Sequence, residues 1–171
     1  MSGMSSSAAF LVAIVLAAST VGGAQAESLK VAVFDLELVN TSTPHVPPTA
    51  AEQARLAMLS ERLRAALDAG ATIEVVDIGA MREAAAQSNL QACAACDRRF
   101  AEAVGADVSA TGVIHKMSEL ILSLSVFMRD VPSGRIIGAF TADFRGNTDE
   151  SWMRALDWLL KHRILPEEAP T

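Results

Sequence analysis

The 171-residue sequence has few of the side chains on which catalytic and metal-binding sites depend. Its three histidines stand singly, at spacings that do not suit a shared metal ion. The hydrolase motifs Gly-x-Ser-x-Gly and Ser-x-x-Lys do not occur, and there is no glycine-rich phosphate loop. We therefore predict a protein that is not an enzyme and that uses no cofactor and no bound metal.

Clusters of basic side chains are also missing. The sequence has 14 Lys and Arg residues against 20 Asp and Glu residues, which gives a net charge of −6. The nearest approaches to a basic cluster are the pairs Arg62 with Arg64 and Arg98 with Arg99. Pairs this short do not match the phosphates of nucleic acid or an anionic membrane surface. We expect no nucleic acid among the partners.

The first 26 residues lack charged side chains altogether. Within them, residues 8–18 form an apolar run that suits the core of a signal peptide but is too short to span a bilayer. Ala24 and Ala26 have the small side chains that a signal peptidase requires. We predict that 1–26 is a cleavable signal peptide, that the mature protein is periplasmic, and that it has no stable membrane insertion after cleavage. The alternative is an uncleaved anchor, because no Lys or Arg precedes the apolar run.

The rest of the chain predicts one α/β domain over residues 27–165, followed by a short tail over 166–171. Alternating apolar residues in 120–128, then Pro132 and Gly134, are typical of a strand and a tight turn. The element order β-α-β-α-α-β-β-β-α predicts a mixed sheet of about five strands flanked by helices, with a C-terminal antiparallel hairpin. The predicted strands are 29–38, 73–76, 106–116, 120–128 and 135–145, and the predicted helices are 49–69, 78–87, 97–104 and 147–165.

Two helix starts have the sequence of a capping box. Thr49 with Glu52 begins the first helix, in which leucines recur on one face. Asn147 with Glu150 has the same spacing at the last helix, whose buried stripe should begin with Trp152.

The two cysteines form the motif Cys93-Ala-Ala-Cys96. In an oxidising compartment neighbouring thiols usually form a disulfide, and this one would fix the turn that starts the helix 97–104. A redox-active pair is an alternative, since a cysteine at a helix N-terminus has a lowered pKa. Metal binding is a third, although two thiolates need two more ligands.

A polar run marks the place where the last strand turns into the last helix. It consists of Asp143, Arg145, Asn147, Asp149 and Glu150, followed by Trp152. Such a position can bring side chains together into a binding cluster. The structural alternative, which we favour, is that Asn147 and Glu150 cap the helix while Arg145 pairs with Asp35 or Asp107 from another element.

Four motifs occur in the order found in exported α/β domains. They are Lys30-Val-Ala-Val-Phe-Asp35, Gly105-Ala-Asp107, Thr111-Gly-Val113 and Asp130-Val-Pro-Ser-Gly134. Together they resemble the amino-terminal domain of TolB and the CsgG-like proteins. The resemblance implies the fold of those domains, and a fold alone does not fix a function.

A second resemblance is to an uncharacterised family of exported proteobacterial proteins, known only as a domain of unknown function. It rests on Cys93-x-x-Cys96, on Gly105-Ala-Asp107 and on the run from Asp143 to Trp152. This resemblance implies a Gram-negative periplasm and brings no activity with it.

These observations favour a periplasmic accessory or binding protein without catalytic activity, which docks onto an envelope protein or a small ligand. The loop 40–48 contains three prolines and is our candidate contact surface. The alternative function is a thiol–disulfide redox or metal-handling protein that uses Cys93 and Cys96.

Overall fold

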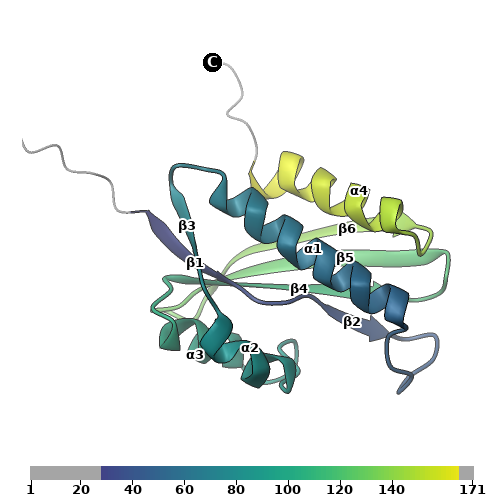
Figure 1. Ribbon diagram of the computed structural model, residues 1–171, viewed down its shortest axis with the longest axis horizontal. Coiled ribbons are helices and arrows are strands. Elements are labelled where there is room, and N and C mark those ends of the chain that lie inside the picture. Colours follow the sequence, from purple (N-terminus) through teal and green to yellow (C-terminus); the bar gives the residue numbers. More distant parts are fainter. Residues whose placement is uncertain (1–27, 166–171) are drawn as a thin grey trace, which may run out of the picture.

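A mixed sheet of six strands forms the centre of the structure, a computed structural model that describes residues 28–165 (Figure 1). The strand order is β3-β1-β4-β5-β6, and β2 pairs with β4 beyond the end of β1. β1 runs parallel to β3 and β4, and β2 runs parallel to β4. β5 is antiparallel to both of its neighbours, β4 and β6. The strands are β1 Leu29–Val33, β2 Glu37–Asn40, β3 Ile73–Val76, β4 Val108–Lys116, β5 Ile121–Asp130 and β6 Ile136–Arg145.

The α/β class, the mixed sheet and the C-terminal hairpin are confirmed. The predicted first strand is wrong in one respect, because residues 29–38 form two strands and the sheet has six strands rather than five. The break follows from Gly112, since a Cβ atom there would lie 2.6 Å from Cγ of Leu36. Leu36 thus packs directly on the backbone of β4, and its N–H bonds to Oγ of Ser60, 2.9 Å away, instead of a neighbouring strand.

Helices cover both faces of the sheet (Figure 1). α1 Ala50–Asp68 and α4 Asp149–Leu159 lie on one face, and α4 continues into the π-helical turn η1 Leu160–Ile164. α2 Gly79–Ala86 and α3 Cys96–Ala103 pack on the other face. α2 and α3 are short, and the second face is therefore only partly covered.

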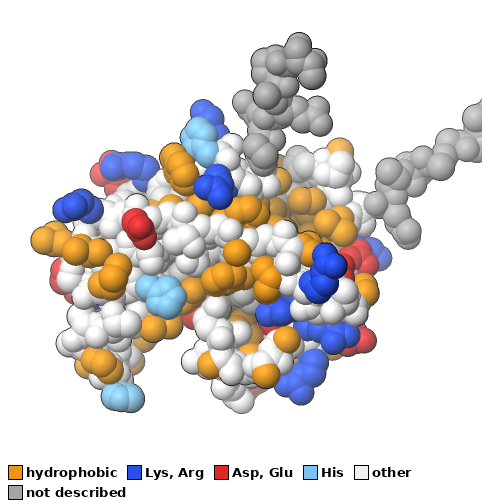
Figure 2. All heavy atoms as spheres, turned by 180° about the vertical axis from the view of Figure 1, so that it is seen from behind, with side chains coloured by type: hydrophobic (Ala, Val, Ile, Leu, Met, Phe, Trp, Pro, Cys, Tyr) orange, Lys and Arg blue, Asp and Glu red, His pale blue; other side chains and the backbone are white. Residues whose placement is uncertain are grey.

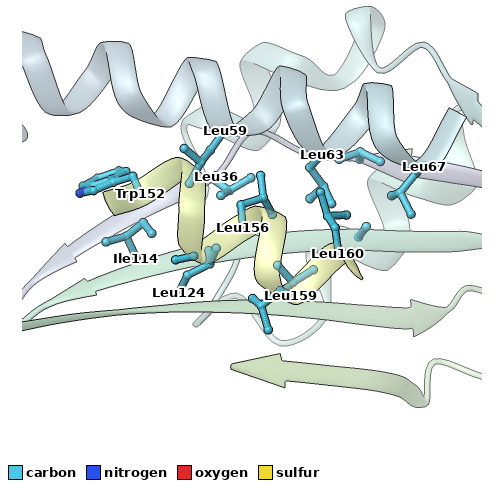
Figure 3. Close-up of a cluster of buried hydrophobic side chains, with 14 of the residues drawn as sticks. Leu36, Leu59, Leu63, Leu67, Ile114, Leu124, Trp152, Leu156, Leu159 and Leu160 are labelled. Carbon is cyan, nitrogen blue, oxygen red and sulfur yellow. The ribbon is translucent and has the colours of Figure 1, made fainter. Parts of the chain in front are cut away.

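The larger core lies between the sheet and the pair α1 and α4 (Figure 3). The apolar stripe predicted for α1 is buried at Leu59, Leu63 and Leu67. Trp152 of α4 is completely buried as well and meets Phe144 edge-on. Burying side chains of this size stabilises the fold by about 1.5–3 kcal/mol each. The smaller core under α2 and α3 includes Cys96.

One helix start differs from its prediction. The capping box of Thr49 and Glu52 forms as expected, but Thr148 with Ser151, rather than Asn147 with Glu150, caps α4. The side chain of Asn147 instead forms hydrogen bonds with Glu52 and Glu119. Residues 1–27 and 166–171, and with them the predicted cleavage site and tail, lie outside the described residues.

Candidate functional site

A buried ion pair lies at the end of the sheet where β4 stops. Lys116 and Glu52 have side chains that are 7% and 3% exposed, and Nζ of Lys116 lies 2.7 Å from Oε1 of Glu52. Lys116 also pairs with Glu119 in the turn that follows. The amide nitrogen of Asn147 donates to Oε1 of Glu52 and to Oε2 of Glu119, both at 2.9 Å. The Glu52–Lys116–Glu119–Asn147 network therefore joins α1, β4, the β4–β5 turn and the residue before the N-cap of α4.

A second layer of contacts continues this network towards α4. Oδ1 of Asn147 accepts a hydrogen bond from Nε1 of Trp152 at 3.0 Å and one from Arg55 at 3.2 Å. Arg55 donates in turn to Asp149, 2.6 Å away, and its guanidinium lies 5.8 Å from the centre of the Trp152 ring. A buried tryptophan usually finds such a partner for its N–H.

The charges of the network stabilise one another. Burial would by itself raise the pKa of Glu52, but hydrogen bonds from Lys116, Thr49 and Asn147 outweigh it and lower that pKa to about 2. Hydrogen bonds to Glu119 and Glu52 raise the pKa of Lys116, and the same bond from Lys116 lowers the pKa of Glu119. The pair stays ionised at neutral pH, and each of the four members has a partner within the network. This arrangement suits a structural clamp better than proton transfer.

The clamp holds a turn whose outer side chains are apolar. Met117, Leu120 and Ile121 are 49%, 68% and 48% exposed. We name these three residues the apolar tip. A cleft of about 250 Å³ lies beside them, lined also by residues 143–145 of β6. In Figure 2, which shows the molecule from behind, hydrophobic side chains lie among charged ones at the left, the end at which the β4–β5 turn lies.

The proline-rich loop 40–48 leaves the sheet next to the apolar tip. The backbone N–H of Thr41 donates to the carbonyl oxygen of Lys116 at 3.0 Å, directly before the tip. The loop is exposed from Thr41 to Pro47, and only its end residues Asn40 and Pro48 are half-buried. Val46 is an exposed apolar side chain within it. The predicted contact loop and the apolar tip thus lie at the same end of the sheet.

The structure divides the predicted polar run into three groups. Asn147, Asp149 and Trp152 belong to the contacts around the network, whereas Glu150 pairs with Arg154 on the surface of α4. Asp143 and Arg145 are exposed on the face of β6 away from α4.

The expected partners of Arg145 are wrong. Asp35 pairs with Arg64 and Arg82, and the carboxylate of Asp107 accepts the backbone N–H of Lys30. Within residues 28–165, Arg145 forms no ion pair.

Cys93 and Cys96 form a disulfide that closes the turn before α3. Ala94 and Ala95 inside the turn have positive φ angles of 51° and 66°. Cys96 is 1% exposed, and its neighbour Asp97 is tied to the sheet by Ser109 and Arg129, at 2.6 and 3.0 Å. No group of three or more His, Cys, Asp or Glu side chains in the described part of the chain is arranged to hold a metal ion.

The chain belongs to a family described as a protein of unknown function, DUF2380, whose model DUF3280 matches residues 29–164. This confirms the predicted membership of an uncharacterised family. No curated protein matches the chain. The resemblance to TolB and CsgG-like proteins stays a prediction.

Among solved structures, the lipoprotein GNA1162 from Neisseria meningitidis is 14% identical, with 82% of this chain and 99% of that chain covered and a TM-score of 0.52. The C-terminal domain of LpoB from Salmonella enterica is 17% identical, with 71% and 85% covered and a TM-score of 0.47. At these identities the likeness to GNA1162 shows a shared fold. Within residues 28–165, no helix has the length and apolar character needed to cross a membrane.

Proposed function

We propose that this protein is a non-catalytic accessory module of the bacterial periplasm, which docks onto another envelope protein through the apolar tip. The observation that carries the proposal is the exposure of Met117, Leu120 and Ile121 together on one turn. Scattered exposed apolar residues are normal, but a group of them rimmed by polar side chains is typical of a protein-binding site.

The buried network supports a binding role for the turn. Lys116 and Glu119 lie on either side of Met117. Lys116 pairs with Glu52 of α1 and with Glu119, and Glu119 accepts a further hydrogen bond from Asn147. A turn fixed in this way loses little conformational freedom when it binds, so more of the contact energy appears as affinity. The proline-rich loop beside it is stiff for a different reason, because each proline fixes its own φ.

The location in the envelope rests on the predicted signal peptide. The fold shared with GNA1162, which is described as a lipoprotein, agrees with an envelope location. A small ligand is the other occupant that the sequence suggests, and the cleft of about 250 Å³ beside the tip is the place where it would bind.

Site-specific photo-crosslinking in living cells tests the proposal. A photoreactive phenylalanine analogue replaces Leu120 in one strain and Leu29 in a matched control strain. Both leucines are exposed, but Leu29 lies at the start of β1, outside the tip. We expect a discrete protein adduct from position 120 and none from position 29. Equal labelling from both positions, or none from 120, contradicts docking through the tip.

A charged variant then separates binding from folding. Ile121→Asp places a carboxylate on the tip without changing the buried face of β5, because Ile121 is 48% exposed. We expect the adduct to disappear while the circular dichroism and the urea midpoint stay close to those of the native protein. A normal adduct in this variant would exclude the apolar tip as the contact surface.

A further inference from the structure

The outer edge of β6 has hydrogen-bonding groups that no described strand uses. β6 is the last strand in the sheet order, and only β5 pairs with it among residues 28–165. The N–H of Gly146 bonds to the carbonyl oxygen of Leu120 at 3.2 Å, and the register places Ile121 opposite Arg145. In an antiparallel ladder, hydrogen-bonded and non-bonded pairs alternate, so Ala139, Thr141, Asp143 and Arg145 turn their N–H and C=O groups outward.

This edge also lacks the usual protection against pairing with another strand. The run from Ile136 to Ala142 contains no charge and no proline, and Ile136 and Ile137 are exposed. Natural edge strands are normally blocked by lysine, proline or inward-pointing charges, or are covered by another element. The outer edge of β6 is therefore open to pairing with a further strand.

A groove of about 570 Å³ lies along the second half of this edge. One wall is formed by residues 141–145 of β6, and the other by Ser151, Arg154, Ala155 and Trp158 of α4. Trp158 is 46% exposed there. An added strand would place alternate side chains in this groove, in the manner of β-strand addition.

The charges on the edge define the sequence that it would accept. Phe140, Ala142 and Phe144 pack towards the larger core, so Asp143 and Arg145 share the opposite, exposed face. An antiparallel strand would complement them with an acidic residue facing Arg145 and, two residues later, a basic residue facing Asp143. β6 itself has this pattern in Asp143-Phe-Arg145 and is therefore complementary to itself.

We propose that the occupant of this edge is a second copy of the chain, paired antiparallel through β6 about a two-fold axis at Phe144. Asp143 of each copy faces Arg145 of the other and Ala142 faces Gly146, so residues 142–146 of the two copies pair and join the two sheets at the end of β6. Because the faces are preserved, both α4 helices lie on the same side of the joined sheets. The dimer uses the outer edge of β6 and does not depend on docking through the apolar tip.

Charge-reversal variants in sedimentation velocity test this pairing on the protein expressed from its full gene and purified from the bacterial envelope. Asp143→Arg and Arg145→Asp each create two like-charge contacts across the two-fold axis, and should weaken the dimer about tenfold or more. The double variant carries both changes, restores the opposite-charge pairs and should return to within about threefold of the native protein. Arg135→Asp has the same charge change as Arg145→Asp but lies outside the paired stretch, so it should leave the dimer unchanged.

The outcomes are distinct. Loss of the dimer in both single variants and its return in the double variant support the proposed register. A native protein that is monomeric up to about 100 µM overturns the proposal, as does a dimer that neither single variant weakens. Single variants that weaken a dimer which the double variant does not restore exclude the pairing of Asp143 with Arg145. The apolar tip is tested with a different partner and readout, so either proposal can fail alone.

Discussion

Lys116 and Glu52 lie 64 residues apart in the sequence, yet they form an ion pair of 2.7 Å that is almost completely buried. Taking two charges out of water is costly, and such a pair is retained only when further hydrogen bonds satisfy both groups. Glu119, Asn147 and Thr49 supply those bonds. The pair fixes the position of α1 relative to the turn that carries the apolar tip.

Replacing Lys116 by Met should strongly destabilise the protein. The change removes the cation and leaves the carboxylate of Glu52 buried without its ionic partner, which typically costs about 3–5 kcal/mol. Urea unfolding followed by tryptophan fluorescence measures the free energy of unfolding, and Trp152 reports directly because its N–H bonds to Asn147.

Glu119→Gln is the matched control for that variant. Glu119 pairs with the same lysine but its side chain is 71% exposed, and exposed ion pairs contribute at most about 1 kcal/mol. An equal loss of stability in the two variants would show that burial of the pair is not the source of the effect.

Acid should destabilise the protein through Glu52. Because the pKa of this carboxyl is lowered from 4.5 to about 2 in the folded state, its contribution is complete above about pH 5 and is lost as the pH falls towards 2. A shift of this size corresponds to about 3 kcal/mol. Urea midpoints at pH 6 and pH 3 measure the loss, which should be clearly smaller in Glu52→Gln. An identical pH dependence in that variant would assign the effect to other carboxylates.

Local patterns predicted most of the fold. Strand and helix boundaries followed from alternation, from the leucine stripe of α1 and from the capping box at Thr49, because those signals act between residues close in sequence. The break between β1 and β2 was missed. It depends on Leu36 packing over Gly112, a contact between distant residues that no local pattern reveals.

The site was less predictable for the same reason. The sequence shows Glu52 only as a capping residue, and it does not show which residue would pair with Lys116. The polar run was found, but Asn147 was assigned to the helix cap, although its side chain bonds to Glu52 and Glu119. The one available signal was the position of Lys116 at the end of an apolar strand. A lysine is rarely buried without a partner, so this position indicates that an acidic residue lies nearby.

Gly112→Ala should destabilise the protein by about 1–3 kcal/mol. The new methyl group would lie 2.6 Å from Cγ of Leu36, so either the leucine or β4 must move. Gly70→Ala is the control, since its nearest neighbour would be 4.0 Å away. Thermal unfolding of both variants checks the contrast. Equal melting temperatures in the two variants would show that the side chain of Leu36 is loosely packed against Gly112.

Removing the disulfide should have a small effect on stability. Cys93 and Cys96 are only three positions apart, so the disulfide closes a very short loop. By restricting the unfolded chain, such a disulfide stabilises the folded state by only about 2 kcal/mol. Ala94 and Ala95 are held at positive φ, which costs roughly 1 kcal/mol or more at each alanine and is relieved when the bridge is absent. The two effects largely offset each other. We expect Cys93→Ser with Cys96→Ser to change the free energy of unfolding by less than about 1.5 kcal/mol, and to leave crosslinking from position 120 intact. Loss of the crosslink in a folded double variant would instead assign the function to the thiol pair, which is the redox or metal-handling alternative.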